Sequence, residues 1–106
     1  MVKTRNARMA EGFVDLGVLP GGNRSLALGV NKGPLIVGQS RTTSTGAVRA
    51  FLAAPCDGGM VRLSDKVSNG AGWTLVSAED INEAGWIVGY GLYNGYTTAF
   101  VLTPNY

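Results

Sequence analysis

Apolar and polar positions alternate over short segments along the whole chain. In the segment LIVGQS, the side chains of Leu35, Val37 and Gln39 would face one side of an extended strand, and those between them the other. Clusters of Gly, Asn and Ser, which are typical turn residues, separate these segments. No segment of the sequence keeps a helical period with matching caps. The pattern predicts an all-β chain of eight strands, at 11–18, 24–30, 34–40, 47–54, 59–64, 74–81, 85–92 and 96–103.

The second half of the chain repeats the first. The segment VNKGPLIVGQS at 30–40 corresponds to INEAGWIVGYG at 81–91, and RAFLAAP at 49–55 corresponds to TAFVLTP at 98–104. A shorter match relates FVDL at 13–16 to MVRL at 60–63. The offsets are 51, 49 and 47 residues, and a period of this size indicates a repeat architecture. We expect one β domain, 13–106, made of two repeats at about 13–57 and 58–106.

Four strands per repeat favour two four-stranded propeller-like blades. The alternative is an eight-stranded sandwich or barrel that closes within one chain. In the blade interpretation the strand after 96–103 is lacking, and the strand 11–18 at the start of the chain is spare. We expect this spare strand to complete the last blade, either in the same chain or in the next one. Several identical chains would then close a ring, so self-association into a homo-oligomer is predicted.

Glycine occurs at the same register in both copies of one strand, at Gly38 and Gly89. Glycine weakens a strand unless something packs closely against it, and we expect a second sheet stacked on this position. Trp86 and Tyr90 stand where the first copy has Leu35 and Gln39, and they are expected to fill the gap between sheets.

These residues resemble the bacterial extracellular HAF repeat family, from Phe13 onward. The first copy carries the pattern at 15–19, Gly21-Gly22, Ser25, Ala27, Asn31, 36–40, Gly46 and 50–52, and the second copy carries it from Gly70 to Pro104. The chain departs from the family at its eponymous His, since Arg49 and Thr98 precede the two Ala-Phe motifs. The resemblance implies a secreted or cell-surface bacterial β-repeat protein and implies no defined activity. The sequence as given has no apolar segment of a signal peptide after its basic start.

The net charge of +2 comes from the start of the chain. Lys3, Arg5 and Arg8 account for three of nine basic residues, so the remaining six bases and seven acids sum to −1. Residues 1–12 are therefore interpreted as a flexible basic arm, and a body of this charge predicts no nucleic-acid binding. No apolar run is long enough for a membrane span. Cys56 is the single cysteine, so an internal disulfide is excluded.

Histidine is absent from the sequence, which excludes Ser–His and Cys–His catalytic pairs and the usual histidine zinc sites. The segment DINEAG, 80–85, has the outline of a calcium loop, but it lacks the acidic ligands that such a loop needs at its later positions. A tight turn held by Asn82 is the better interpretation, and Asn31 stands at the matching place in the first copy. No spacing pairs the carboxylates as a glycosidase requires. We expect no catalytic residue, no metal site and no cofactor.

Aromatic residues are concentrated in the second copy, where they suggest a ligand surface. Trp73 follows a Gly-rich loop, and Tyr93 and Tyr96 flank the turn Asn94-Gly95. Aromatic rings beside polar groups bind sugars and other flat ligands, so Trp73, Tyr93, Asn94 and Tyr96 are the candidate ligand-binding residues. The sequence favours a non-enzymatic β-repeat binding or assembly module, with carbohydrate as the candidate ligand. The alternatives are a purely structural oligomerisation protein and a glycan-acting enzyme.

Overall fold

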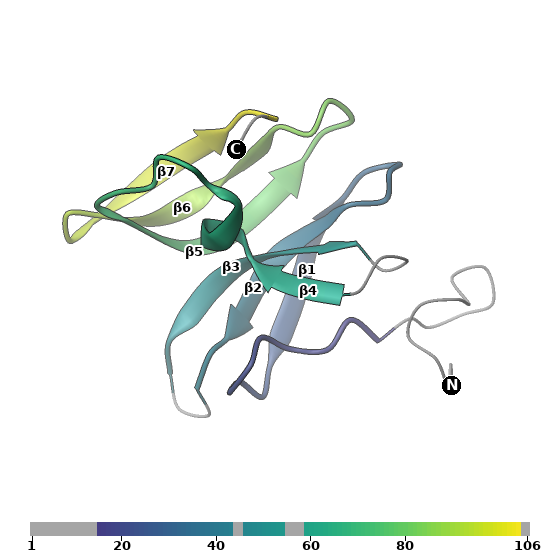
Figure 1. Ribbon diagram of the computed structural model, residues 1–106, viewed down its shortest axis with the longest axis horizontal. Helices are drawn as coiled ribbons and strands as arrows, with labels where there is room; N and C mark the ends of the chain where they lie inside the picture. The colour runs from purple at the N-terminus through teal and green to yellow at the C-terminus, as the bar shows by residue number, and fades with distance from the viewer. Residues whose placement is uncertain (1–14, 44–45, 55–58, 105–106) are drawn as a thin grey trace.

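The structure is a computed structural model that describes residues 15–43, 46–54 and 59–104. The described residues form an all-β fold with seven strands and one short 3-10 helix, as predicted for the fold class (Figure 1). The elements in chain order are β1 (Ser25–Val30), β2 (Ile36–Arg41), β3 (Val48–Ala54), β4 (Gly59–Arg62), η2 (Leu63–Lys66), β5 (Trp73–Ile81), β6 (Ile87–Tyr93) and β7 (Tyr96–Leu102).

The strands form two antiparallel sheets, which do not close into a barrel. The first sheet has the order β1-β2-β3-β4 and the second has the order β5-β6-β7, so every strand pairs with its neighbour in sequence. The predicted grouping of the first four strands after residue 24 is confirmed, and β4 belongs to the first sheet through its pairing with β3. β5 lies across the first sheet and contacts β1, β2 and β3, which brings the two sheets face to face.

The predicted strand at 11–18 is wrong for its described part. Residues 11–14 lie outside the described residues, and 15–18 form no strand. Here the turn chemistry overrides the alternating pattern, because Asp15 Oδ1 accepts a hydrogen bond from the Gly17 backbone N–H at 2.8 Å and Gly17 has a positive φ of 83°. Leu16 packs on the first sheet, so these residues are not a strand of the second sheet in their own chain.

The main core lies between the two sheets. The first sheet contributes Val37 and Ala50, the second contributes Ala78, Ile87 and Phe100, and all of them are buried. Val37 and Ala50 lie on the same face of the first sheet, since Val37 pairs with Leu52 and Gln39 pairs with Ala50. We call this side of the first sheet its inner face.

The opposite face of the first sheet is covered by the segment that precedes β1. Leu19 is 1% exposed and packs with Phe51 and Ala53, and Leu16 lies against the same cluster. The Leu19 backbone N–H donates to Ser40 Oγ at 2.9 Å, which fixes the segment to β2. Residues from the start of the described chain therefore serve as a lid of irregular structure on this face.

Neighbouring strands of the same sheet leave no room for a side chain at Gly38 and Gly89. A Cβ built at Gly38 would lie 2.0 Å from the Leu26 carbonyl oxygen and 2.9 Å from the Phe51 ring, and one built at Gly89 would lie 2.1 Å from the Ser77 oxygen. Both glycines stand opposite a bulged strand, where the register shifts between Ala27 and Gly29 in β1 and again in β5. The close neighbour that the sequence predicted is thus the adjacent strand and a Phe side chain. The Gly89 face of the second sheet does meet the first sheet, whereas the Gly38 face is covered by the segment before β1, so the expectation of a stacked sheet is corrected for Gly38.

The two matching turns of the repeat lie side by side. Asn31 Oδ1 accepts from the Leu35 N–H at 2.8 Å, and Asn82 Oδ1 accepts from the Trp86 N–H at 2.9 Å. The prediction of an Asn-held turn is confirmed in both copies. Asn31 Nδ2 also donates to the Asn82 carbonyl oxygen at 3.0 Å, so the turn of the first repeat is hydrogen-bonded to the matching turn of the second repeat.

Candidate functional site

The four candidate ligand-binding residues lie together at one end of the second sheet. Trp73 is the register partner of Tyr93, and Tyr93 is in turn the partner of Tyr96. Asn94 lies in the turn between β6 and β7 with a positive φ of 50°, and its backbone N–H donates to the Gly72 carbonyl oxygen at 3.0 Å. The structure thus brings the four residues together, because the two-residue Asn-Gly turn puts its flanking tyrosines in register.

Trp73 is engaged in packing at the centre of this cluster. Its ring lies 5.0 Å from that of Tyr93 at an interplanar angle of 36°, and 6.1 Å from that of Phe100 in an edge-on arrangement at 85°. Trp73 is half-buried, whereas Tyr93 is 42% and Tyr96 is 77% exposed. Tyr96 and Tyr93 therefore offer the accessible rings, and Trp73 supports them from below.

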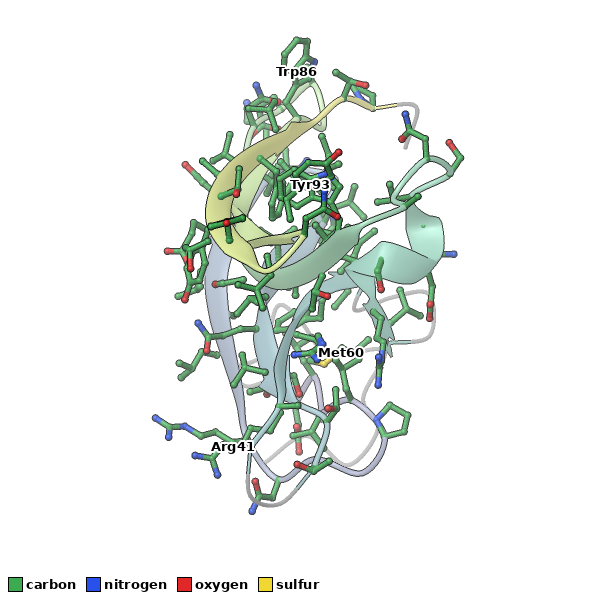
Figure 2. All side chains as sticks on the ribbon, turned by 90° about the vertical axis from the view of Figure 1, so that its left-hand side faces the viewer. Arg41, Met60, Trp86 and Tyr93 are labelled. Atoms are coloured by element: carbon green, nitrogen blue, oxygen red, sulfur yellow. The ribbon has the colours of Figure 1, made fainter. Side chains whose placement is uncertain are left out.

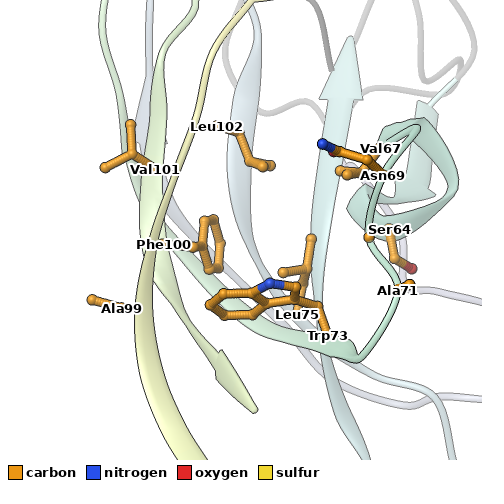
Figure 3. Close-up of a pocket in the computed structure, with 11 residues that line it drawn as sticks. Ser64, Val67, Asn69, Ala71, Trp73, Leu75, Ala99, Phe100, Val101 and Leu102 are labelled. Carbon is orange, nitrogen blue, oxygen red and sulfur yellow. The ribbon is translucent and has the colours of Figure 1, made fainter. Parts of the chain in front are cut away.

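A pocket of about 610 Å³ adjoins this cluster. Figure 3 shows Phe100 and Leu102 pointing from β7 into the pocket toward Trp73 and Leu75, while Ala99 and Val101 point away. Ser64, Val67 and Asn69 form the facing wall, which belongs to η2 and the loop after it. Because Ala99 and Val101 line the pocket without pointing into it, the backbone edge of β7 forms one of its sides. This volume is in the range that binds ligands of drug size or short peptides.

The second sheet also has an exposed apolar face, which we call the outer face. It consists of Val88, Tyr90, Leu92, Ala99 and Val101. Val88 is 41%, Tyr90 40%, Leu92 38% and Val101 56% exposed. An apolar surface of this extent on one sheet is unusual for an isolated domain and is typical of an interaction site.

Trp86 and Tyr90 do not fill the gap between the two sheets of the chain, so that expectation is wrong. Trp86 is 45% exposed at one end of the molecule, where it stands clear of the first sheet (Figure 2). Its counterpart in the first copy, Leu35, packs against the main core. The difference arises because the inner face of the first sheet is covered by the second, whereas the outer face has no third sheet over it.

The acidic residues make structural hydrogen bonds. Glu83 Oε1 accepts from the Lys32 backbone N–H at 2.9 Å, and Asp80 Oδ1 accepts from the Ile81 N–H at 2.9 Å. Glu79 accepts from the Ser77 hydroxyl, which itself accepts from Gln39 Nε2 of the first sheet. Within 15–43, 46–54 and 59–104, His, Cys, Asp and Glu form no group of three that would hold a metal ion. Cys56 lies outside the described residues.

No helix in the described part of the chain is long and apolar enough to cross a membrane.

Two stacked blades without a third are expected to leave apolar sheet faces bare, but the residues of the outer face and the pocket were not predicted from the sequence. The signal for the outer face was present in the repeat alignment, since Val88 matches Val37 and Val101 matches Leu52. The signal for the pocket was weaker. The first repeat has a fourth strand that pairs with its third, whereas the second repeat has no matching strand after β7 among the described residues, which leaves that edge open.

Comparison with known proteins gives no match, whether to family models, to curated proteins or to solved structures.

Proposed function

We propose that this protein is a non-enzymatic assembly module whose repeats pack on one another, and that the outer face binds a second copy of the chain. The observation that carries this proposal is the pair Val37 and Val88. Val37 is fully buried under the second sheet, and Val88, at the same repeat position, is 41% exposed. Ala50 is likewise 1% exposed while its counterpart Ala99 is exposed. The face that mediates packing within the chain is thus presented again at the end of the chain.

The first sheet lies at the opposite end of the stack from the outer face, and whether its free face is covered determines how two chains can associate. Repeat stacks need a terminal unit that shields the last apolar face. At the first sheet, Leu16 and Leu19 shield the face around Phe51. Because Leu16 and Leu19 cover one end of the stack and the outer face is exposed at the other, two chains associate through the same face, which gives a closed pair related by a two-fold axis and not an open filament.

Light scattering over a concentration series tests this proposal. We expect a dimer that becomes a monomer on Val88→Lys or Tyr90→Glu, because a charge would be buried without a partner. Val30→Lys is the matched control, since Val30 is 60% exposed on β1 and lies outside the outer face. A monomer at every concentration for the unaltered protein would overturn the proposal.

A second candidate function is carbohydrate binding at the aromatic cluster. The observation that favours it is Tyr96, which is 77% exposed and is the register partner of Tyr93. Sugars stack on such rings and bond to nearby amides such as that of Asn94. A glycan array would show binding that Tyr96→Ala abolishes. Binding that survives Tyr96→Ala and Tyr93→Ala together would exclude this site.

We further propose that the two sheets are propeller-like blades of the HAF repeat type, and that the protein acts at the cell surface or outside the cell. The support for blades is the meandering strand order of both sheets and their face-to-face contact through β5. The support for the family and the location is the sequence pattern alone. Secretion would be tested by locating a tagged protein in its producing cell.

A further inference from the structure

The outer edge of β7 is the counterpart of an edge that is paired in the first copy. There, β3 pairs with β4 through Phe51 with Arg62, Leu52 with Val61, and Ala53 with Met60. The corresponding residues of β7 are Phe100, Val101 and Leu102, 49 positions later. Among the described residues β7 pairs only with β6, since it ends the strand order of its sheet.

The pocket lies along this same edge. Phe100, Val101 and Leu102 all line it, and its other wall comes from Trp73, Leu75 and Val67 (Figure 3). A strand added to β7 would place alternate side chains into this pocket, which has both apolar and polar lining, and leave the others on the outer face. Addition of an extended segment to an exposed sheet edge is a common mode of recognition, in which backbone hydrogen bonds give affinity and pockets give specificity.

The sequence of this chain contains a second segment with the pattern of β4. Gly59-Met60-Val61-Arg62-Leu63 is matched by residues 12–16, which read Gly-Phe-Val-Asp-Leu, 47 positions earlier. Residues 12–14 lie outside the described part of the chain, and fourteen residues precede its start. Leu16 lies on the first sheet of its own chain, on the face that the second sheet does not cover.

We propose that the β7 edge and its pocket form a strand-acceptor site for residues 12–16 of a second copy of this chain. The site rests on the self-assembly proposed above but uses a different surface. The first sheet supplies the register: antiparallel pairing places Phe13 opposite Leu102, Val14 opposite Val101, and Asp15 opposite Phe100.

The chemistry of the pocket suits this register. Met60, the counterpart of Phe13, lies on the same face of its sheet as Phe51. Phe13 would therefore lie on the Phe100 face, in the pocket with Trp73 and Leu75. Asp15 would lie on the same face, where Ser64 and Asn69 provide hydrogen-bond donors.

The donating chain gives up the packing of Leu16 beside Phe51 when the segment leaves, but it keeps Leu19 on the first sheet. Leu19 remains held by its bond to Ser40 Oγ and by full burial. The Gly17 carbonyl oxygen accepts a hydrogen bond from Ser25 Oγ at 2.8 Å, so residues 12–16 would leave on the N-terminal side of a fixed point, at the cost of the bond from the Gly17 N–H to Asp15 Oδ1.

Disulfide trapping in the full-length chain tests the site. In a Cys56→Ser background, chains with Val14→Cys are mixed with isotope-labelled chains with Val101→Cys, and the mixed disulfide is quantified by mass spectrometry. We expect about tenfold more product than with Val88→Cys as the partner, because Cα atoms must lie within about 7 Å to be bridged. Equal yields from the two partners, or no product with Val101→Cys, would overturn the proposal.

Two further variants separate the competing explanations. Phe13→Asp should abolish the mixed disulfide, whereas Phe13→Met, which copies β4, should retain it; equal loss in both contradicts the pocket's role. A chain carrying both Val14→Cys and Val101→Cys that closes on itself in dilute solution would show donation within one chain and overturn the second copy as donor. The trapping is repeated with Val88→Lys added: a mixed disulfide that still forms shows that strand donation does not depend on the outer face, whereas its loss in a folded chain would overturn the assignment of a separate surface.

Discussion

The two copies of the repeat form the same structure but have different surroundings. Both have an Asn-held turn, a bulged strand and a glycine between a carbonyl oxygen and a Phe ring. The first sheet is covered on both faces, by Leu19 on one side and by the second sheet on the other. The second sheet is covered on one face only. The difference shows that the local sequence determines the conformation of each copy, and that position in the stack determines which residues are buried.

The largest expected difference between the copies concerns their Phe residues. Phe51 is fully buried under the N-terminal segment, so Phe51→Ala should lower the free energy of unfolding by about 4 kcal/mol. Phe100 borders the pocket and is 7% exposed, so Phe100→Ala should cost about 3 kcal/mol. Urea unfolding followed by tryptophan fluorescence measures both. A greater loss of unfolding free energy for Phe100→Ala than for Phe51→Ala would contradict the conclusion that Phe51 is the better covered of the two.

The paired glycines test how similar the copies are. Gly38→Ala and Gly89→Ala should each cost about 3 kcal/mol, because the new Cβ meets a backbone carbonyl oxygen that cannot move aside. Gly46→Ala is the control, with no atoms within 4 Å, and should stay within about 0.5 kcal/mol. Thermal and urea unfolding give the values. Unequal losses of unfolding free energy at these two matching positions of the repeat would show that the bulges in β1 and β5 are not equivalent.

The two turn asparagines should contribute differently to the free energy of unfolding, because only the Asn31 side chain bonds to the other repeat. Asn31→Ala removes the hydrogen bonds that Oδ1 accepts and the one that Nδ2 donates to Asn82, and it should cost about 2 kcal/mol, whereas Asn82→Ala should cost about 1 kcal/mol. Asn31→Asp keeps the Oδ1 acceptor but replaces the donor with a charged oxygen that faces the Asn82 carbonyl oxygen. Its loss in urea unfolding should therefore include both the lost bond and this repulsion, and a loss of zero would show that the contact between the two turns contributes nothing.

The smallest effect is expected on the outer face. Val88→Thr should change the stability of the dilute protein by less than about 0.5 kcal/mol, while Val37→Thr should cost about 2 kcal/mol because it buries a hydroxyl group. Unfolding at two protein concentrations makes the comparison sharper. Val88→Thr should become costlier as concentration rises, since association would bury the same position.

The strand positions could be predicted because alternation and turn residues are local signals. β2, β3, β6 and β7 lie where the pattern put them, within one or two residues at each end. The fate of the strand predicted at 11–18 could not be read in this way, because apolar residues such as Leu16 and Val18 have the same pattern whether they pair in a sheet or cover one. The place of Leu16 and Leu19 is decided by Phe51 and Ser40, which are distant in sequence.

The part of the candidate site that depends on local signals could also be predicted from the sequence. Trp73, Tyr93, Asn94 and Tyr96 meet through one short turn and the pairing it imposes. The exposure of Tyr90 depends on how many sheets stand in the stack, which no window of sequence encodes. The pocket depends on which strand edge is paired, and that too is a property of the assembled sheets.

The packing between the two sheets is directional, because the Phe100 face of one meets the Val37 face of the other. A duplication that appended another copy of the repeat would therefore extend the chain without any new surface having to evolve. The number of units in such a protein can change by a single recombination event, and each added unit inherits a docking partner already encoded in its predecessor.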